Sequence, residues 1–290
     1  MKDLMLALLL PLLWGTAFTL SKPASEHFPT LFMQGGVYLF CSAGYALFTG
    51  TARKTPLGIA ALLTLLAGAG QAFLLFLGLS GLDASVAVLL LQVQVPITVL
   101  ASALINRERI SPVRMLGIAI AFGGVAAVAG LPSKPVPLVP LLEVLAGALM
   151  WGIGQALIKR FGKDSAPNMF RIVSMLSWPA MLAASLLIEH GQLESVRTAT
   201  PGIWASLAGL TIGGMALGNG LWYLLVMRRR MDEVAPFLLL MPVVGVVASA
   251  LVLGETISLS HYLGGALILL GLAIVTGIPG RYEQPSTAGP

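Results

Sequence analysis

The sequence predicts an all-α, polytopic membrane protein whose ten transmembrane helices form a five-plus-five inverted repeat. Hydrophobic residues make up 57% of the 290-residue chain and charged residues only 10%, whereas a soluble domain carries about 25% charged residues. The chain divides into ten apolar stretches, each near the roughly 20 residues that a helix needs to cross a bilayer. Its two halves also repeat one pattern, which opens with Trp14-Gly15 and again with Trp151-Gly152.

The first repeat is expected at residues 1–130. Lys2 gives the first stretch the basic start of a signal peptide, but the stretch is longer than a typical apolar core of such a peptide. It also matches the stretch at Trp151, so we expect a retained helix. Ser111-Pro112 fits an N-cap followed by proline at the first helical position. The five predicted spans are 4–21, 31–50, 57–78, 84–105 and 112–130.

A linker is expected at 131–140 and the second repeat at 141–280, followed by a polar tail at 281–290. The tail contains Pro285 and is expected to be disordered and cytoplasmic. The five spans of the second repeat are 141–159, 168–189, 203–226, 234–253 and 261–279.

A proline lies near the middle of the fourth span of each repeat, at Pro96 and Pro242. Proline lacks a backbone donor and leaves the carbonyl four residues earlier without its helical partner. In lipid that carbonyl needs another partner. We therefore predict that both prolines are helix hinges beside the presumed site.

The basic residues indicate the orientation. Threading ten spans from a cytoplasmic N-terminus places all of the 17 Lys and Arg residues on the cytoplasmic side except Lys22, Lys134 and Arg197. The positive-inside rule then predicts an inner-membrane protein with both termini in the cytoplasm. The run Arg228–Arg230 is interpreted as a topological anchor, because no basic face with interleaved aromatic residues accompanies it to bind nucleic acid.

Polar side chains inside the spans are the candidate substrate-binding residues. An unpaired amide is costly in hydrocarbon, so these groups should face the bundle interior. Gln92 and Gln94 are two residues apart and point in nearly opposite directions, so at most one faces a cavity squarely. The alternative is that the amides only bond neighbouring helices. The candidates are Trp14, Gln34, Gln71, Gln92, Gln94, Trp151, Gln155, Asn219 and Trp222.

Several kinds of chemistry are missing. No acid or histidine occupies a midplane position, where a proton relay normally has one, so a neutral or zwitterionic solute fits better than a lipophilic cation. The metalloprotease, serine-hydrolase, P-loop and CxxC signatures are absent, and the single cysteine, Cys41, has no partner for a metal site. We expect no enzyme activity, no catalytic residue, no metal and no cofactor.

Several phrases resemble the EamA family of the drug/metabolite transporter superfamily. They are Trp14-Gly15-Thr16-Ala17-Phe18, Leu91-Gln92-Val93-Gln94, Glu108-Arg109-Ile110, and Met241-Pro242-Val243-Val244 through Gly254-Glu255-Thr256. The pattern is most similar to the branch that exports amino acids and related compounds such as cysteine and O-acetylserine. The resemblance implies a cavity lined by the first, third and fourth helices of each half, which favours all the candidates except Gln34. It departs at the second span, where the family often has an arginine and this chain has Gly35-Gly36.

Together these features predict a secondary transporter that exports small metabolites, amino acids or their derivatives, by alternating access. Two inverted repeats suit this mechanism because they enclose a site near the midplane. Its partners would be the solute and the lipid bilayer. A multidrug or sugar-type carrier on the same scaffold is the alternative, and an integral-membrane enzyme or scaffold is a remote one. The sequence does not specify the substrate, the direction of transport, the energy coupling or the choice between monomer and homodimer.

Overall fold

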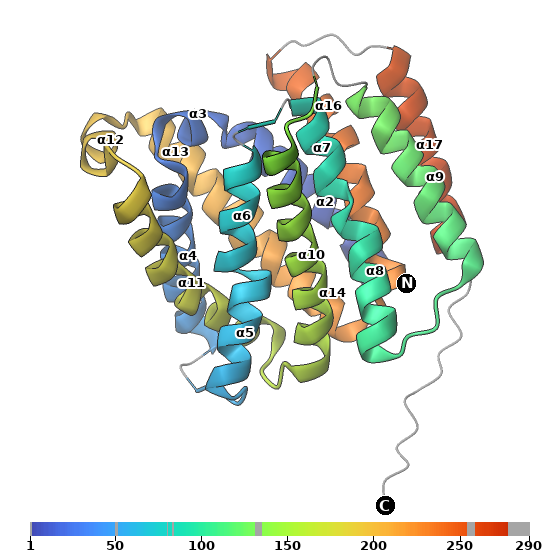
Figure 1. Cartoon of the computed structure of the whole chain (residues 1–290), viewed down its shortest axis with the longest axis horizontal. Coiled ribbons are helices and arrows are strands. Elements are labelled where there is room, and N and C mark those ends of the chain that lie inside the picture. Colours follow the sequence, from blue (N-terminus) through green and yellow to red (C-terminus); the bar gives the residue numbers. More distant parts are fainter. Residues whose placement is uncertain are drawn as a thin grey trace, which may run out of the picture.

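A computed structural model of the chain describes residues 2–49, 52–79, 81–82, 84–130, 135–253 and 259–277. The described part is a bundle of helices that lie side by side and run up and down along roughly one common direction (Figure 1). Residues 131–134 of the predicted linker, residues 254–258 with the phrase Gly254-Glu255-Thr256, and the tail at 281–290 lie outside the described residues.

The first repeat contributes five spans, close to the predicted limits. A short helix that the sequence did not predict, α3 (Lys22–His27), follows the first span. The spans are α1 (Lys2–Ala7) with α2 (Leu9–Leu20), α4 (Thr30–Thr49), α5 (Leu57–Ala67) with α6 (Ala69–Leu79), α7 (Ala84–Gln92) with α8 (Gln94–Asn106), and α9 (Pro112–Ala129).

The second repeat follows the same plan, with an unpredicted short helix, α12 (Gln192–Thr198), after its second span. The eighth span consists of α13 (Pro201–Gly209), the π-helix η1 (Leu210–Asn219) and α14 (Gly220–Arg228). The ninth consists of α15 (Met231–Val234), the 3-10 helix η2 (Ala235–Leu240) and α16 (Met241–Leu253). The remaining spans are α10 (Leu138–Phe161), α11 (Ala166–Ile188) and α17 (Leu259–Thr276).

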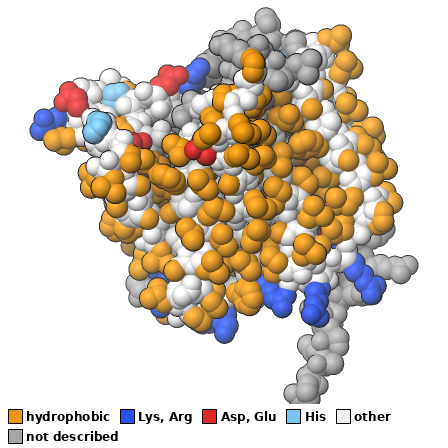
Figure 2. Space-filling view, viewed as in Figure 1, with side chains coloured by type: hydrophobic (Ala, Val, Ile, Leu, Met, Phe, Trp, Pro, Cys, Tyr) orange, Lys and Arg blue, Asp and Glu red, His pale blue; other side chains and the backbone are white. Residues whose placement is uncertain are grey.

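The described residues confirm the predicted fold class. Nine helical segments are long and apolar enough to cross a membrane, and Asp3–Ala17 is a shorter apolar helix. Hydrophobic side chains cover the face of the bundle seen in Figure 2, and most of the Lys and Arg side chains in this view lie along its lower edge. This distribution is what a bilayer-spanning bundle requires.

The two most extensive helix contacts between the repeats are those of α9 with α17 and of α4 with α11. A Cβ atom added to Gly124 of α9 would lie 2.5 Å from the Gly264 carbonyl oxygen of α17, and one added to Gly117 would lie 2.7 Å from the Gly271 oxygen. Glycine lets the two backbones approach this closely. The second pair is α4 and α11, where the Glu189 carboxylate accepts hydrogen bonds from the Leu31 and Phe32 amides at 2.8 and 3.1 Å.

Two helix interruptions lie just before prolines. The break between α1 and α2 at Leu8 comes three residues before Pro11, and the break between α7 and α8 at Val93 comes three residues before Pro96. In both cases proline lacks the donor that would continue the helix. In the ninth span Pro242 has no N–H to donate to the Leu238 carbonyl. That carbonyl instead accepts a hydrogen bond from the Met241 amide in the 3-10 turn.

The start of α9 refines one prediction. Ser111 occupies the N-cap position and Pro112 the first helical position, as expected. The Ser111 hydroxyl makes no capping hydrogen bond, however, and its carbonyl oxygen accepts the Met115 amide at 3.0 Å. Because Pro112 has no backbone N–H, the first position of α9 has no donor that would need a capping acceptor.

Candidate functional site

Three tryptophans from the first, sixth and eighth spans form an aromatic cluster in the core of the bundle. The Trp151 and Trp222 rings are stacked, with centroids 5.3 Å apart and an interplanar angle of 20°. The Trp14 ring lies 6.0 Å from that of Trp222. Trp222 is 0% exposed. Because Trp14 and Trp151 begin equivalent phrases of the two repeats, the cluster brings both halves to one point.

Polar groups fix the rings of this tryptophan cluster. The Trp222 indole donates to the Gln155 side-chain oxygen at 3.0 Å, and Gln155 is 1% exposed. The Trp14 indole donates to the Gly214 carbonyl of η1 at 2.9 Å. Buried indole groups normally require such acceptors. Trp151 and Gln155 are four residues apart on α10 and so share a helix face, which meets Trp222.

The π-helix η1 receives side chains from the first two spans. Besides the Trp14 bond, the Tyr45 hydroxyl donates to the Ala216 carbonyl at 2.8 Å. The hydrogen-bond pattern of a π-helix differs from that of an α-helix, and short π segments are frequent at functional sites. Gly218 is needed here, because a side chain at that position would collide with the Trp14 indole.

The other predicted binding residues lie outside the tryptophan cluster. Gln34 and Gln92 are buried, and Gln71, Gln94 and Asn219 are partly exposed. The Asn219 amide contacts the Met215 sulfur of its own helix at 3.4 Å. Within the described residues, no hydrogen bond joins any of these five side chains to the three tryptophans.

Gln92 differs from the other amides. Its side chain is 4% exposed, and its Oε1 atom has no hydrogen-bond partner among the described residues. A buried acceptor without a donor costs about 1–3 kcal/mol. Gln92 lies directly before the break at Val93. Among the predicted residues, Gln92 therefore has a buried acceptor atom that is free to accept a hydrogen bond from a water molecule or a polar solute.

An apolar groove of about 580 Å³ lies between α4 and the eighth span. Tyr45, Cys41 and Thr211 contribute its few polar atoms, while exposed Phe40 and Phe48 mark its outer edge. None of the predicted binding residues lines it. No feature of the sequence predicted this groove, because it arises from the way the second and eighth spans meet.

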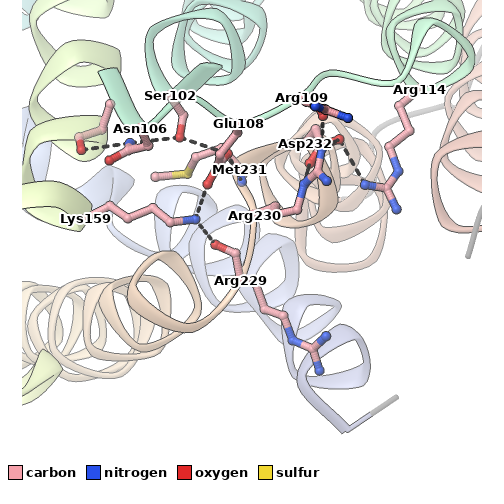
Figure 3. A network of polar contacts seen from close by, with 11 residues as sticks. Ser102, Asn106, Glu108, Arg109, Arg114, Lys159, Arg229, Arg230, Met231 and Asp232 are labelled. Atoms are coloured by element: carbon pink, nitrogen blue, oxygen red, sulfur yellow. Dashed lines mark hydrogen bonds and ion pairs between the residues drawn. The ribbon is translucent and has the colours of Figure 1, made fainter. Parts of the chain in front are cut away.

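A network of polar contacts, which sequence reasoning missed, occupies the end of the bundle that carries most of the basic side chains (Figure 3). Arg229 bonds the Asp3 carboxylate at 2.7 Å and Arg230 bonds Asp232 at 3.0 Å, so these two arginines form ion pairs at this end of the bundle. The signal was Arg114, which sits inside a predicted span and is buried against Asp232 at 2.9 Å. The described residues contain no group of three or more His, Cys, Asp or Glu side chains that could hold a metal ion.

Comparisons with known proteins agree with this architecture. The EamA-like transporter family matches residues 1–130 and 139–277. A protein of Salmonella typhimurium named probable amino-acid metabolite efflux pump is 32% identical over 284 residues, and one of Escherichia coli with the same name is 30% identical. Both alignments cover 94% of each chain. One crystal structure superposes with a TM-score of 0.83 at 18% identity and covers 95% of this chain and 97% of its own, which establishes the fold alone.

Proposed function

We propose, from the premise that the chain belongs to the EamA-like transporter family, that it exports amino acids or their derivatives across the inner membrane. Membership makes it a membrane transporter and not an enzyme. The finer proposal of substrate class is supported by the two relatives named probable amino-acid metabolite efflux pumps, which align over nearly the whole chain.

The tryptophan cluster is the observation that carries the proposed binding site. Trp14 and Trp151 come from equivalent places in two inverted repeats and meet at Trp222. A site shared by both repeats near the midplane is what alternating access requires. Indole faces, the Gln155 amide and the unpartnered Gln92 oxygen suit a small solute with a polar, neutral or zwitterionic group.

We infer alternating access as the mechanism, with one repeat rocking against the other. The interrupted helices at Val93 and at η2 support hinges near Pro96 and Pro242. The distribution of basic side chains supports cytoplasmic termini, because the basic end of the bundle would face inward. A C-terminal reporter fusion active only in the periplasm would contradict this orientation.

The experiment that tests export uses proteoliposomes loaded with a panel of labelled amino acids and O-acetylated derivatives. At least one solute should leave protein-containing vesicles faster than protein-free vesicles, and Gln92→Leu should raise its apparent KM. Release at the protein-free rate for the whole panel would overturn the proposed substrate class. Equal KM for Gln92→Leu would remove Gln92 from the site.

One observation favours the alternative of a multidrug carrier: the apolar groove between α4 and the eighth span would accept a lipophilic compound from the bilayer. Resistance profiling of overexpressing cells separates the two candidates. Growth protection against hydrophobic drugs that is lost in Ala208→Trp, which would fill the groove, would favour the carrier of drugs. Protection against toxic amino-acid analogues alone would favour metabolite export.

A further inference from the structure

The polar contacts at the basic end of the bundle join the two repeats. Arg114 of the first repeat bonds Asp232 and Glu233 of the second at 2.9 and 3.5 Å. Asp3 of the first repeat bonds Arg229 of the second. Such contacts would have to separate whenever the halves move apart at this end.

Glu108 has the central position in this network. Its Oε1 atom pairs with the Lys159 ammonium, and its Oε2 atom accepts from the Ser102 hydroxyl at 3.0 Å and the Met231 amide at 3.2 Å. The side chain is only 12% exposed. The Lys159 ammonium donates in addition to the Arg229 carbonyl. One carboxylate thus connects the ends of the fourth, sixth and ninth spans (Figure 3).

The backbone before Glu108 is bent to bring it there. Arg107 adopts a left-handed conformation with φ of 55°, which is unfavourable for a residue with a side chain. It is the only non-glycine residue with positive φ in the described part of the chain. Asn106 supports the turn, because its side-chain amide donates to Ser102 and to the Ala156 carbonyl, both at 3.1 Å. Local strain of this kind persists where the surrounding contacts hold it.

Further into the bundle from Glu108, α8 and α10 pack closely against each other. Thr98 of α8 is fully buried, and a Cβ atom added to Gly152 of α10 would lie 3.2 Å from its hydroxyl. Gly152 follows Trp151 of the tryptophan cluster directly. Glu108 therefore lies at the outer end of a closely packed contact between α8 and α10, and this contact extends inward to the proposed binding site.

We propose that Glu108 is the latch of the cytoplasmic gate: its bonds to Lys159 and Met231 hold the fourth span against the sixth and ninth and must break in every transport cycle. This inference rests on the proposed alternating-access function. Removing one member of a partly buried pair leaves the other charge without its partner, so the latched state should lose population when Glu108 becomes neutral. Separation of the spans lets water solvate both charges.

The first test measures closure without a substrate. In a Cys41→Ala background, the reporter Thr98→Cys is labelled in inside-out vesicles with a membrane-impermeant thiol reagent. Glu108→Gln should raise the labelling rate about tenfold, the factor that corresponds to about 1.4 kcal/mol. Glu194→Gln, which neutralises an exposed carboxylate of α12, is the matched control and should leave the rate unchanged. An unchanged rate in Glu108→Gln would overturn the latch.

The second test stands even if Glu108→Gln folds poorly. Glu108→Cys with Lys159→Cys, joined by a short cleavable crosslinker, should stop transport, and a reductant should restore it. The control joins Glu194→Cys to Thr198→Cys, which lie one turn apart on exposed α12 within the second repeat, and its crosslink should leave most transport intact. Full transport by the Glu108–Lys159 crosslinked protein would also overturn the latch. Because labelling needs no solute, absence of amino-acid export would count against the proposed substrate and leave the labelling result valid.

Discussion

Gln155 holds one ring of the tryptophan cluster, and its removal should be measurable. Gln155→Leu leaves the Trp222 indole N–H buried without its acceptor, at a cost of about 1–3 kcal/mol. We expect a lower midpoint of thermal unfolding in detergent and a higher apparent KM. In a Trp222→Phe background the same change should cost much less, because the donor is gone. Equal costs in both backgrounds would show that this hydrogen bond contributes nothing.

Asp164 provides a pH-dependent prediction outside the membrane. Burial opposes ionisation of this carboxylate, but hydrogen bonds from the Thr55 hydroxyl at 2.6 Å, from the Lys54 and Thr55 amides and from Asn168 outweigh it and lower its pKa below 3.8. A lowered pKa contributes stability that is complete above pH 3.8 and is lost as the pH falls through the folded-state value.

Asp164→Asn should therefore lower the unfolding midpoint at pH 7 and change it much less at pH 2. Thermal unfolding of the detergent-solubilised protein at both pH values is the measurement. Glu194→Gln, on the exposed face of α12, should track the unmodified chain at both. An equal loss at pH 7 and pH 2 would mean that the ionised form of Asp164 has no special role.

At the scale of the helix, the prolines of the fourth and ninth spans are predicted to limit turnover. Pro96→Ala and Pro242→Ala restore a backbone donor and stiffen a helix that is interrupted in this structure. We expect both variants to fold in normal yield and to transport severalfold more slowly. Pro179→Ala is the control, because α11 continues unbroken through Pro179. Normal transport by both variants at equal expression would exclude the hinges.

The pairing of α9 with α17 gives a sharper contrast between adjacent residues. A Cβ atom at Gly124 would lie 2.5 Å from the Gly264 oxygen, whereas one at Gly123 would meet nothing within 4 Å. Overpacking a close contact typically costs about 1–3 kcal/mol. Gly124→Ala should therefore lower the unfolding midpoint and Gly123→Ala should not. Similar midpoints for the two variants would show that the helices can separate without cost.

The sequence predicted the ten spans to within a few residues, because hydrocarbon thickness sets helix length and the composition marks each span. It missed what depends on contacts between spans. The π-helix η1 has an ordinary apolar sequence, and its conformation is accompanied by bonds from Trp14 and Tyr45. Spacing along one helix places Trp151 and Gln155 on one face, but no helical period could predict that Trp222 would stack on Trp151 and contact Trp14.

At the scale of the whole molecule, both ends of the bundle are bonded between repeats, through different helices. At the basic end the bonds include the fourth, sixth and ninth spans through Glu108. At the opposite end they connect α3 with the second repeat, where His27 bonds the Ser195 carbonyl at 2.8 Å. Alternating access then means exchanging one set of contacts for another, so the balance between states depends on both ends.

The inverted repeat yields a final prediction from this balance. Lys22 stands at the same distance along the chain from Trp14 as Lys159 does from Trp151, and it begins α3 at the opposite end. If Lys22 stabilises closure there as Lys159 does at the basic end, Lys22→Gln should shift the population toward the state closed by Glu108. Thr98→Cys labelling from the cytoplasmic side should then fall, by about fivefold for a loss of about 1 kcal/mol. Glu108→Gln added to Lys22→Gln should return the rate toward its starting value. A labelling rate that rises in Lys22→Gln would contradict this equivalence of Lys22 and Lys159. Loss of a group that closes the opposite end should lower the labelling rate, whereas loss of Glu108, which closes the basic end, should raise it.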